Sequence, residues 1–282
     1  MKFFLLALAI WMPASIVLGA VNERTFERTL NVSGAVNLDV VTDAGGIKVI
    51  AGSPGVVRVR GIMKAQNWFF GGNAEDHIRA LESNPPVEQS GNTIRAGYVS
   101  DRSLLRGVSL RFEIEVPVQT SVRAKADSGG VHVEGVRGPV DCKTDSGGIE
   151  VRDIESEVRA QADSGGVHIR HVSGQVWARA DSGGIEAFDI AGSIDAQTDS
   201  GGIRMSQTVA ASVHAEADSG GASLKLARNG GYDIRASSGS GGVSVSDITV
   251  HGSISNKKVE GSVRGGGALV KIHTDSGQVV ID

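Results

Sequence analysis

The sequence predicts an all-β fold, a single-stranded β-helix or β-solenoid with 18-residue coils and one short helical insertion. The tetrad Asp-Ser-Gly-Gly recurs six times, at spacings of 18, 18, 18, 18 and 19 residues. A short fixed period is typical of solenoids, in which each unit buries its apolar face against its neighbours. Apolar residues alternate after each tetrad, as in a β-strand. Aromatic residues make up only 4% of the 282 residues, so we expect a thin aliphatic core.

Each predicted coil contains two strands. Counting the aspartate as position one, positions five and seven are apolar, as in Val131 and Val133, and predict the first strand. A corner is expected near Gly135, Gly174 or Gly192 in the respective coils. The second strand is expected at positions thirteen to eighteen. Position sixteen holds Cys142 in one coil and alanine, such as Ala160, in the others, which predicts a buried and unreactive thiol.

The N-terminus has the layout of a cleaved signal peptide. Lys2 precedes a long apolar run that ends in the small residues Gly19 and Ala20. A membrane anchor is the competing interpretation, but Pro13 and Ser15 interrupt the run. We therefore expect an exported protein, in the periplasm, on the outer cell surface or secreted, with no membrane span after cleavage.

The repeat pattern divides the chain into four parts. The expected boundaries are a signal peptide at 1–20, N-terminal strands and a first solenoid unit at 21–60, an insertion with a short helix at 61–108, and the regular solenoid with a C-terminal cap at 109–282. Inside the insertion, Asn73 is expected to cap a helix whose apolar residues Ile78 and Leu81 are three apart. Pro85 and Pro86 then end it.

Composition restricts the partners. Without Lys2, 27 basic side chains face 32 acidic ones, and the charges are interspersed, which argues against nucleic acid as a partner. Cys142 is the only cysteine, so there is no internal disulfide and no cysteine metal cluster. We expect no cofactor, and a partner that is an envelope or surface protein or a glycan.

Three segments resemble a known family. They are "DAGGIKV" from Asp43, "FEIEVPVQTSVRAKADSGGVHVEGVRGPV" from Phe112, and the Ser-Gly-Gly units that follow. They resemble the bacterial putative-adhesin family of β-strand repeats, a β-solenoid domain of unknown function, and the likeness covers Leu38 to Ile281. The resemblance implies an exported envelope protein with a β-helix-like fold. It brings no catalytic residues.

The tetrad aspartates form a predicted column, with one carboxylate per coil and neighbours ~4.8 Å apart. In one interpretation each carboxylate accepts hydrogen bonds from its own turn, and the glycines supply positive φ angles. In the other, the column binds Ca²⁺ through carboxylates, hydroxyls and carbonyls, although one carboxylate per coil is few for this ion. The six candidate ligands are Asp127, Asp145, Asp163, Asp181, Asp199 and Asp218.

Outward position six alternates in charge, through His132, Glu150, His168, Glu186 and Arg204. One interpretation is a ladder of complementary charges on neighbouring strands. The alternative is a polysaccharide-active hydrolase or lyase, because Glu150 and Glu186 would lie two coils, ~10 Å, apart, near the separation in inverting glycosidases. The regularity of the ladder favours a protein without enzymatic activity.

Aromatic residues supply the binding candidates. Trp68, Phe69 and Phe70 are clustered in the insertion, and Trp177 lies at an outward position of the regular array. The cluster is interpreted either as a plug over an open edge or as an exposed contact patch. The predicted function is that of an adhesin-like or envelope-scaffolding protein.

Overall fold

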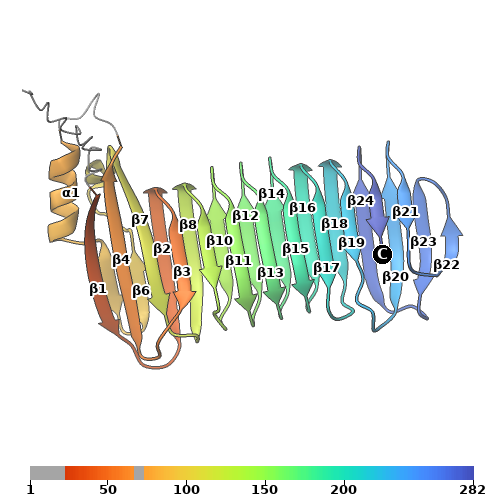
Figure 1. Cartoon of the computed structure of the whole chain (residues 1–282), viewed down its shortest axis with the longest axis horizontal. Coiled ribbons are helices and arrows are strands. Elements are labelled where there is room, and N and C mark those ends of the chain that lie inside the picture. The colour runs from red at the N-terminus through yellow and green to blue at the C-terminus, as the bar shows by residue number, and fades with distance from the viewer. Residues whose placement is uncertain (1–22, 67–72) are drawn as a thin grey trace, which may run out of the picture.

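The structure is a computed structural model that describes residues 23–66 and 73–282. It is an elongated solenoid in which two sheets run along the long axis (Figure 1). Sheet A has 12 strands and sheet B has 13. The predicted β-solenoid is confirmed. The predicted signal peptide and the residues Trp68, Phe69 and Phe70 lie outside the described residues.

Each regular coil gives one strand to sheet B and the next strand to sheet A. Parallel neighbours pair with an offset of 18 residues, as Ile149 pairs with Val167, or of 19, as Ile194 pairs with Val213. The sequence period is therefore the structural period. The strands are β8 (Thr120–Ser128), β9 (Val131–Glu134), β10 (Val140–Thr144), β11 (Ile149–Ile154), β12 (Val158–Ala162), β13 (Val167–Val172), β14 (Val176–Ala180), β15 (Ile185–Ile190), β16 (Ile194–Ser200), β17 (Ile203–Gln207), β18 (Val213–Ser219) and β19 (Ala222–Lys225).

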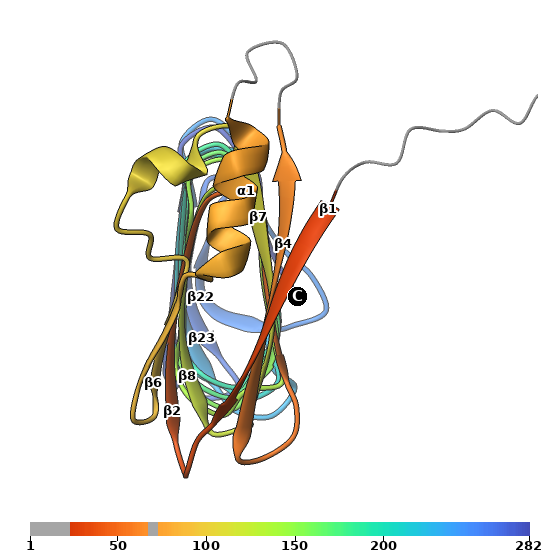
Figure 2. The same cartoon turned by 90° about the vertical axis from the view of Figure 1, so that its left-hand side faces the viewer.

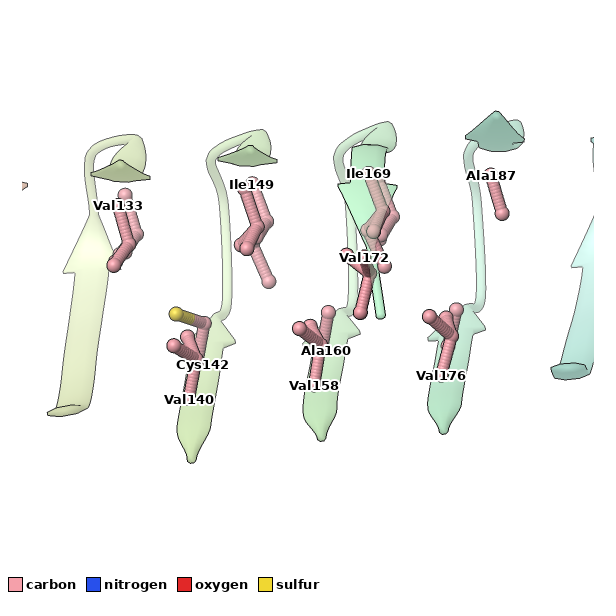
Figure 3. Packing of buried hydrophobic residues seen from close by; sticks show 14 of the residues in the cluster. Val133, Val140, Cys142, Ile149, Val158, Ala160, Ile169, Val172, Val176 and Ala187 are labelled. Atoms are coloured by element: carbon pink, nitrogen blue, oxygen red, sulfur yellow. The ribbon is translucent and has the colours of Figure 1, made fainter. Parts of the chain in front are cut away.

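The core consists of layers of valine, isoleucine and alanine between the two sheets (Figure 3). Ile149 and Val167 are at most 1% exposed. Cys142 pairs with Ala124 on one side and Ala160 on the other, and it is 1% exposed. Burial raises the pKa of its thiol, so the thiolate is strongly disfavoured. The predicted burial of Cys142 is confirmed.

The tetrad corners approach one another closely. Asp145 N donates to Ala126 O at 3.2 Å and Ser146 N donates to Asp127 O at 2.9 Å, so the ladder of hydrogen bonds continues into the corner. A methyl group on Gly147 would overlap the carbonyl oxygen of Gly129. The expectation of a positive φ is wrong for Gly147, whose φ lies outside the left-handed region. Glycine is needed there because a side chain would separate the coils.

The N-terminal end is built out of sequence order. The strands β2 (Val36–Ala44) and β3 (Ile47–Ala51) form a coil that stacks on β8 and β9. The chain then forms β4 (Val56–Ala65) and returns through β6 (Thr93–Ala96) and β7 (Val108–Val116), which stack on the other side of β2 and β3. Antiparallel strands extend this end: β4 pairs with β7, β1 (Glu23–Asn31) with β4, and β5 (Val87–Ser90) with β6.

A helix closes this end of the core. The predicted helix is confirmed as α1 (Ala74–Ser83), and it lies across the open end between the sheets (Figure 2). Its Ile78 and Leu81 are 3% and 2% exposed and join the core cluster. Asn73 is the N-cap residue, but the predicted side-chain cap is wrong, because its side chain makes no capping hydrogen bond. A short 3₁₀ helix, η1 (Arg102–Leu105), contacts α1.

The C-terminal end is also out of sequence order. The strands β24 (Ala268–Thr274) and β25 (Val279–Ile281) lie between the β18–β19 coil and the coil of β20 (Tyr232–Ser238) and β21 (Val243–Val245). The chain terminus therefore lies inside the stack (Figure 1). An antiparallel pair, β22 (Val250–Ile254) and β23 (Lys258–Val263), extends sheet B beyond β20.

Substitution at the two tetrad glycines should have unequal effects. We expect Gly147→Ala to lower the free energy of unfolding by about 1–3 kcal/mol, because the methyl group overpacks the corner. Gly148→Ala is the matched control, since its methyl group would lie 3.4 Å from Gly166 O, an ordinary contact. It should leave stability within about 0.5 kcal/mol. Urea unfolding measures both, and equal losses would contradict the close approach at Gly147.

Candidate functional site

The outer surface of sheet A is a ladder of paired charges. His132 Nδ1 lies 3.1 Å from Glu150 Oε2, and His132 Nε2 lies 3.2 Å from Glu134 Oε2. Arg152 Nε is also 3.2 Å from Glu134 Oε2. The contact with His132 lowers the pKa of Glu134, burial opposes this shift, and Arg152 adds to it. The predicted charge ladder is confirmed on these strands.

Glu186 is the most enclosed carboxylate of the ladder, with 22% of its side chain exposed. His168 Nδ1 lies 3.1 Å from Glu186 Oε2, and Arg204 Nη1 donates to Glu186 Oε1 at 2.7 Å. Burial raises the pKa of Glu186, but the contacts with His168 and Arg204 outweigh burial and hold this pKa below its ordinary value. A glycosidase acid needs a raised pKa. The pKa shift of Glu186 is thus opposite in direction to the one that such an acid requires.

The outer surface of sheet B has a different charge pattern. Arg123 Nε lies 3.7 Å from Asp141 Oδ2, and Lys125 Nζ lies 3.1 Å from Asp127 Oδ1. The next three cations along the sheet, Lys143, Arg159 and Arg179, have no carboxylate within 4.0 Å in the part of the chain that the structure describes. They lie on the successive strands β10, β12 and β14.

Trp177 lies among these cations. The Arg159 guanidinium is 4.4 Å from the centroid of the Trp177 ring, and that of Arg179 is 4.8 Å from it. We call Lys143, Arg159, Trp177 and Arg179 the basic-aromatic patch. Trp177 is one of the binding residues predicted from the sequence, whereas the three cations were not predicted. The 18-residue period places Arg159 beside Trp177, and alternation places Arg179 on the same face, so the repeat register contained the signal.

A groove adjoins the basic-aromatic patch at the start of the sheet B strands. Its volume is about 560 Å³, and it crosses the coils that begin with β6, β2, β8, β10, β12 and β14. Arg159 and Trp177 line it together with Arg123 and the carboxylates of Asp39 and Asp141. The groove has a mixed charge. A polar polymer with separated charges matches such a surface better than an apolar ligand does.

Residues 91–282, more than half of the chain, match the model of a protein family described as Toastrack DUF4097. The chain belongs to the Toastrack family. The matched part of this Toastrack protein contains the whole basic-aromatic patch. Among curated proteins, none matches the sequence.

Three solved structures are similar to this Toastrack chain at low sequence identity. A putative adhesin from Bacteroides fragilis is 16% identical, with 92% of this chain and 97% of that chain covered and a TM-score of 0.49. A putative cell adhesion protein from Clostridium sporogenes is 12% identical, with coverages of 92% and 99% and a TM-score of 0.24. A putative adhesin from Parabacteroides distasonis is 9% identical, with coverages of 93% and 98% and a TM-score of 0.27.

The tetrad aspartates lie at the sheet B corners, one per coil. None of the six carboxylates hydrogen-bonds to an amide of its own turn, so the expected Asx turns are wrong. Thr144 Oγ1 donates to Gly147 O, and Thr274 Oγ1 donates to Gly277 O in the last unit, whereas alanine precedes four of the six aspartates. Within residues 23–66 and 73–282, no three histidine, cysteine or acidic side chains converge as metal ligands do. The Ca²⁺ hypothesis stays a prediction.

Acid should weaken the sheet A ladder. The pKa of Glu186 is lower in the folded chain than the ordinary 4.5, so its stabilising contribution is complete above about that pH. The contribution is lost as the pH falls through the folded-state pKa. We expect Glu186→Gln to cost about 1 kcal/mol at neutral pH and to flatten the fall in melting temperature in acid. Thermal unfolding across pH measures both effects.

The matched control for Glu186→Gln is Glu157→Gln. Glu157 is exposed, and it has no ion pair with another described residue. Glu157→Gln should change neither the free energy of unfolding at neutral pH nor the fall in melting temperature in acid. If the melting temperature falls equally in acid for wild type and Glu186→Gln, then the contacts of Glu186 do not stabilise its ionised form.

The aspartate column should destabilise the fold through repulsion between neighbouring carboxylates. We expect Asp163→Asn to raise the free energy of unfolding by about 0.2–1 kcal/mol at low salt, and less at high salt. Asp153→Asn is the control, because Asp153 Oδ1 lies 3.1 Å from His171 Nδ1 and its loss should not stabilise. Added Ca²⁺ or chelator should leave the melting temperature unchanged. A rise with Ca²⁺ would instead support the cation column.

Proposed function

We propose that this Toastrack protein is a non-enzymatic, adhesin-like binding protein of the cell envelope that holds its partner on sheet B. The unequal charge balance of the two faces carries the proposal. Sheet A pairs its central cations with carboxylates, as at His132, Arg152 and Arg204. On sheet B, Lys143, Arg159 and Arg179 have no ion pair with another described residue, and the two arginines stack on Trp177. Groups that are already paired offer less to a ligand.

The shape of the solenoid supports a binding role. The strands of sheet B present equivalent positions at a repeat of ~4.8 Å along the molecule, so an extended partner can contact several coils. The groove crosses several of these coils. Adhesion is also the role for which the three similar solved structures are named.

Export is part of the proposal. The signal-like sequence at residues 1–20 supports secretion, and a single buried cysteine is compatible with an oxidising compartment. In the described part of the chain, no helix is long and apolar enough to cross a membrane. We propose an envelope or surface protein or a glycan as the partner, and a location in the periplasm, on the cell surface or outside the cell.

Binding explains the surface better than hydrolysis does. Both Glu150 and Glu186 contact basic side chains of the ladder, and the lowered pKa of Glu186 disfavours proton donation. Trp68, Phe69 and Phe70 stay in the proposal as a second contact, on the basis of their sequence alone.

Sedimentation with bacterial cell-envelope fragments tests this function. The mature chain should bind the fragments, and Trp177→Ala should weaken binding about tenfold or more, because aromatic anchors contribute disproportionately. Phe188→Ala is the matched control, since Phe188 lies on sheet A beneath Arg170, whose guanidinium is 5.4 Å from the ring centroid. It should bind like wild type. Circular dichroism verifies that each variant is folded.

Two further variants separate binding from catalysis. Replacement of Trp68, Phe69 and Phe70 by serine should weaken binding without unfolding the solenoid. The double variant Glu150→Gln and Glu186→Gln should bind like wild type. The proposed function fails if no envelope fraction is bound. It also fails if the chain degrades an envelope polysaccharide and the double variant has lost that activity.

A further inference from the structure

The arginines of the basic-aromatic patch are held in place without being neutralised. Arg159 and Arg179 stack on Trp177 at 4.4 and 4.8 Å. A guanidinium stacked on an aromatic ring keeps its in-plane N–H groups available, and these match the two oxygens of a carboxylate. Stacking also restricts the side chain before a ligand arrives, so less conformational entropy is lost on binding. Both arginines are therefore prepared for carboxylate ligands.

The register places the cations in two rows. Lys143, Gln161 and Arg179 occupy one row on β10, β12 and β14. The two cations of this row are two coils apart, which corresponds to ~10 Å along the solenoid. Arg159 and Trp177 are neighbours in the adjacent row. The patch thus presents cations at a period of two coils, with an amide and an aromatic ring between them.

Acidic side chains border the basic-aromatic patch on both sides. The tetrad aspartates Asp145, Asp163 and Asp181 follow the strands at one edge, and Asp141 and Glu157 line the groove at the other. These carboxylates repel a broad anionic surface such as a membrane, and they repel a polymer with a dense row of phosphates. A single extended chain with separated negative charges fits between the two borders.

We infer that the basic-aromatic patch binds an acidic polysaccharide whose carboxylates occur on alternate sugars. This inference rests on the proposed binding function and specifies its ligand. The chain lies along the solenoid axis, and its carboxylates contact Arg179 and Lys143, whose separation is close to the length of two sugar units. Arg159 and Gln161 donate hydrogen bonds between these positions. Trp177 holds the two arginine side chains in place beneath the bound chain.

Hyaluronan oligosaccharides are the probe, because they carry a carboxylate on every second sugar. Isothermal titration should detect binding to the mature chain, weakening as salt increases. The same oligosaccharides with methyl-esterified carboxylates should bind at least tenfold more weakly. Arg179→Gln should reduce the affinity about tenfold or more, because it removes a charge-assisted hydrogen bond. The double variant Lys143→Gln and Arg179→Gln should lose more.

Arg170→Gln is the matched control for Arg179→Gln. It also removes a guanidinium stacked on an aromatic side chain, but on sheet A, where Arg170 Nη2 lies 3.9 Å from Glu186 Oε2. It should leave the affinity for hyaluronan unchanged. Arg179 and Arg170 are both exposed, so neither change should unfold the chain, and circular dichroism checks this.

Three results would overturn the inference: equal losses in Arg179→Gln and Arg170→Gln, equal affinity for the esterified oligosaccharides, or tighter binding of single-stranded DNA or phosphatidylglycerol vesicles than of hyaluronan. The envelope assay separates these results from failure of the proposed function. Envelope binding that depends on Trp177 but not on carboxylates would preserve the function and reject this ligand.

Discussion

The structure depends on the close parallel stacking of its Asp-Ser-Gly-Gly corners. Backbone amides at each corner donate to carbonyls of the neighbouring corner, as Ser164 N does to Asp145 O at 2.9 Å. A side chain at the first glycine would separate the coils, since a methyl group on Gly165 would overlap Gly147 O. This constraint aligns the corners of successive coils, which are offset by 18 residues or, between Gly201 and Gly220, by 19. Every coil then places its valines, isoleucines and alanines in the same layer, and large aromatic residues are not needed to fill the interior.

The same stacking turns each sequence position into a row on the surface, and neighbouring rows differ in what they can do. On sheet A, acidic and basic residues alternate from coil to coil, and their pairing produces a self-contained ladder. On sheet B, the alternation is interrupted where Trp177 follows Arg159 in register, and Arg179 lies beside the same ring. Around this interruption, Arg159 and Arg179 have no ion pair with another described residue, and the backbone is unchanged. Substitution within single rows can thus change the charge pattern of one face and leave the scaffold unchanged.

The two ends solve a problem that the regular coils do not have, since a parallel solenoid leaves strand edges and a core open at each end. At the N-terminal end, the chain places β6 and β7 outside the earlier coil of β2 and β3, adds antiparallel strands, and covers the core with Ile78 and Leu81 of α1. At the C-terminal end, β24 and β25 insert between two earlier coils, and the pair of β22 and β23 extends sheet B. Both ends are thereby tied to the stack by strands distant in sequence.

The sequence alone determined the solenoid, its 18-residue coil, the burial of Cys142 and the helix with Ile78 and Leu81, because each follows from a local period or a repeated position. It also determined the alternating charges of sheet A. Only the tertiary structure decided the order of the coils at the two ends, since strand pairing between distant segments leaves no periodic signal. It also decided that a tetrad glycine such as Gly147 is needed for the close approach of neighbouring coils and does not have a positive φ. The tetrad aspartates make no hydrogen bond to an amide of their own turn. The repeat register places Arg159 and Arg179 near Trp177, but only the tertiary structure showed that these arginines stack on the ring and have no ion pair with another described residue.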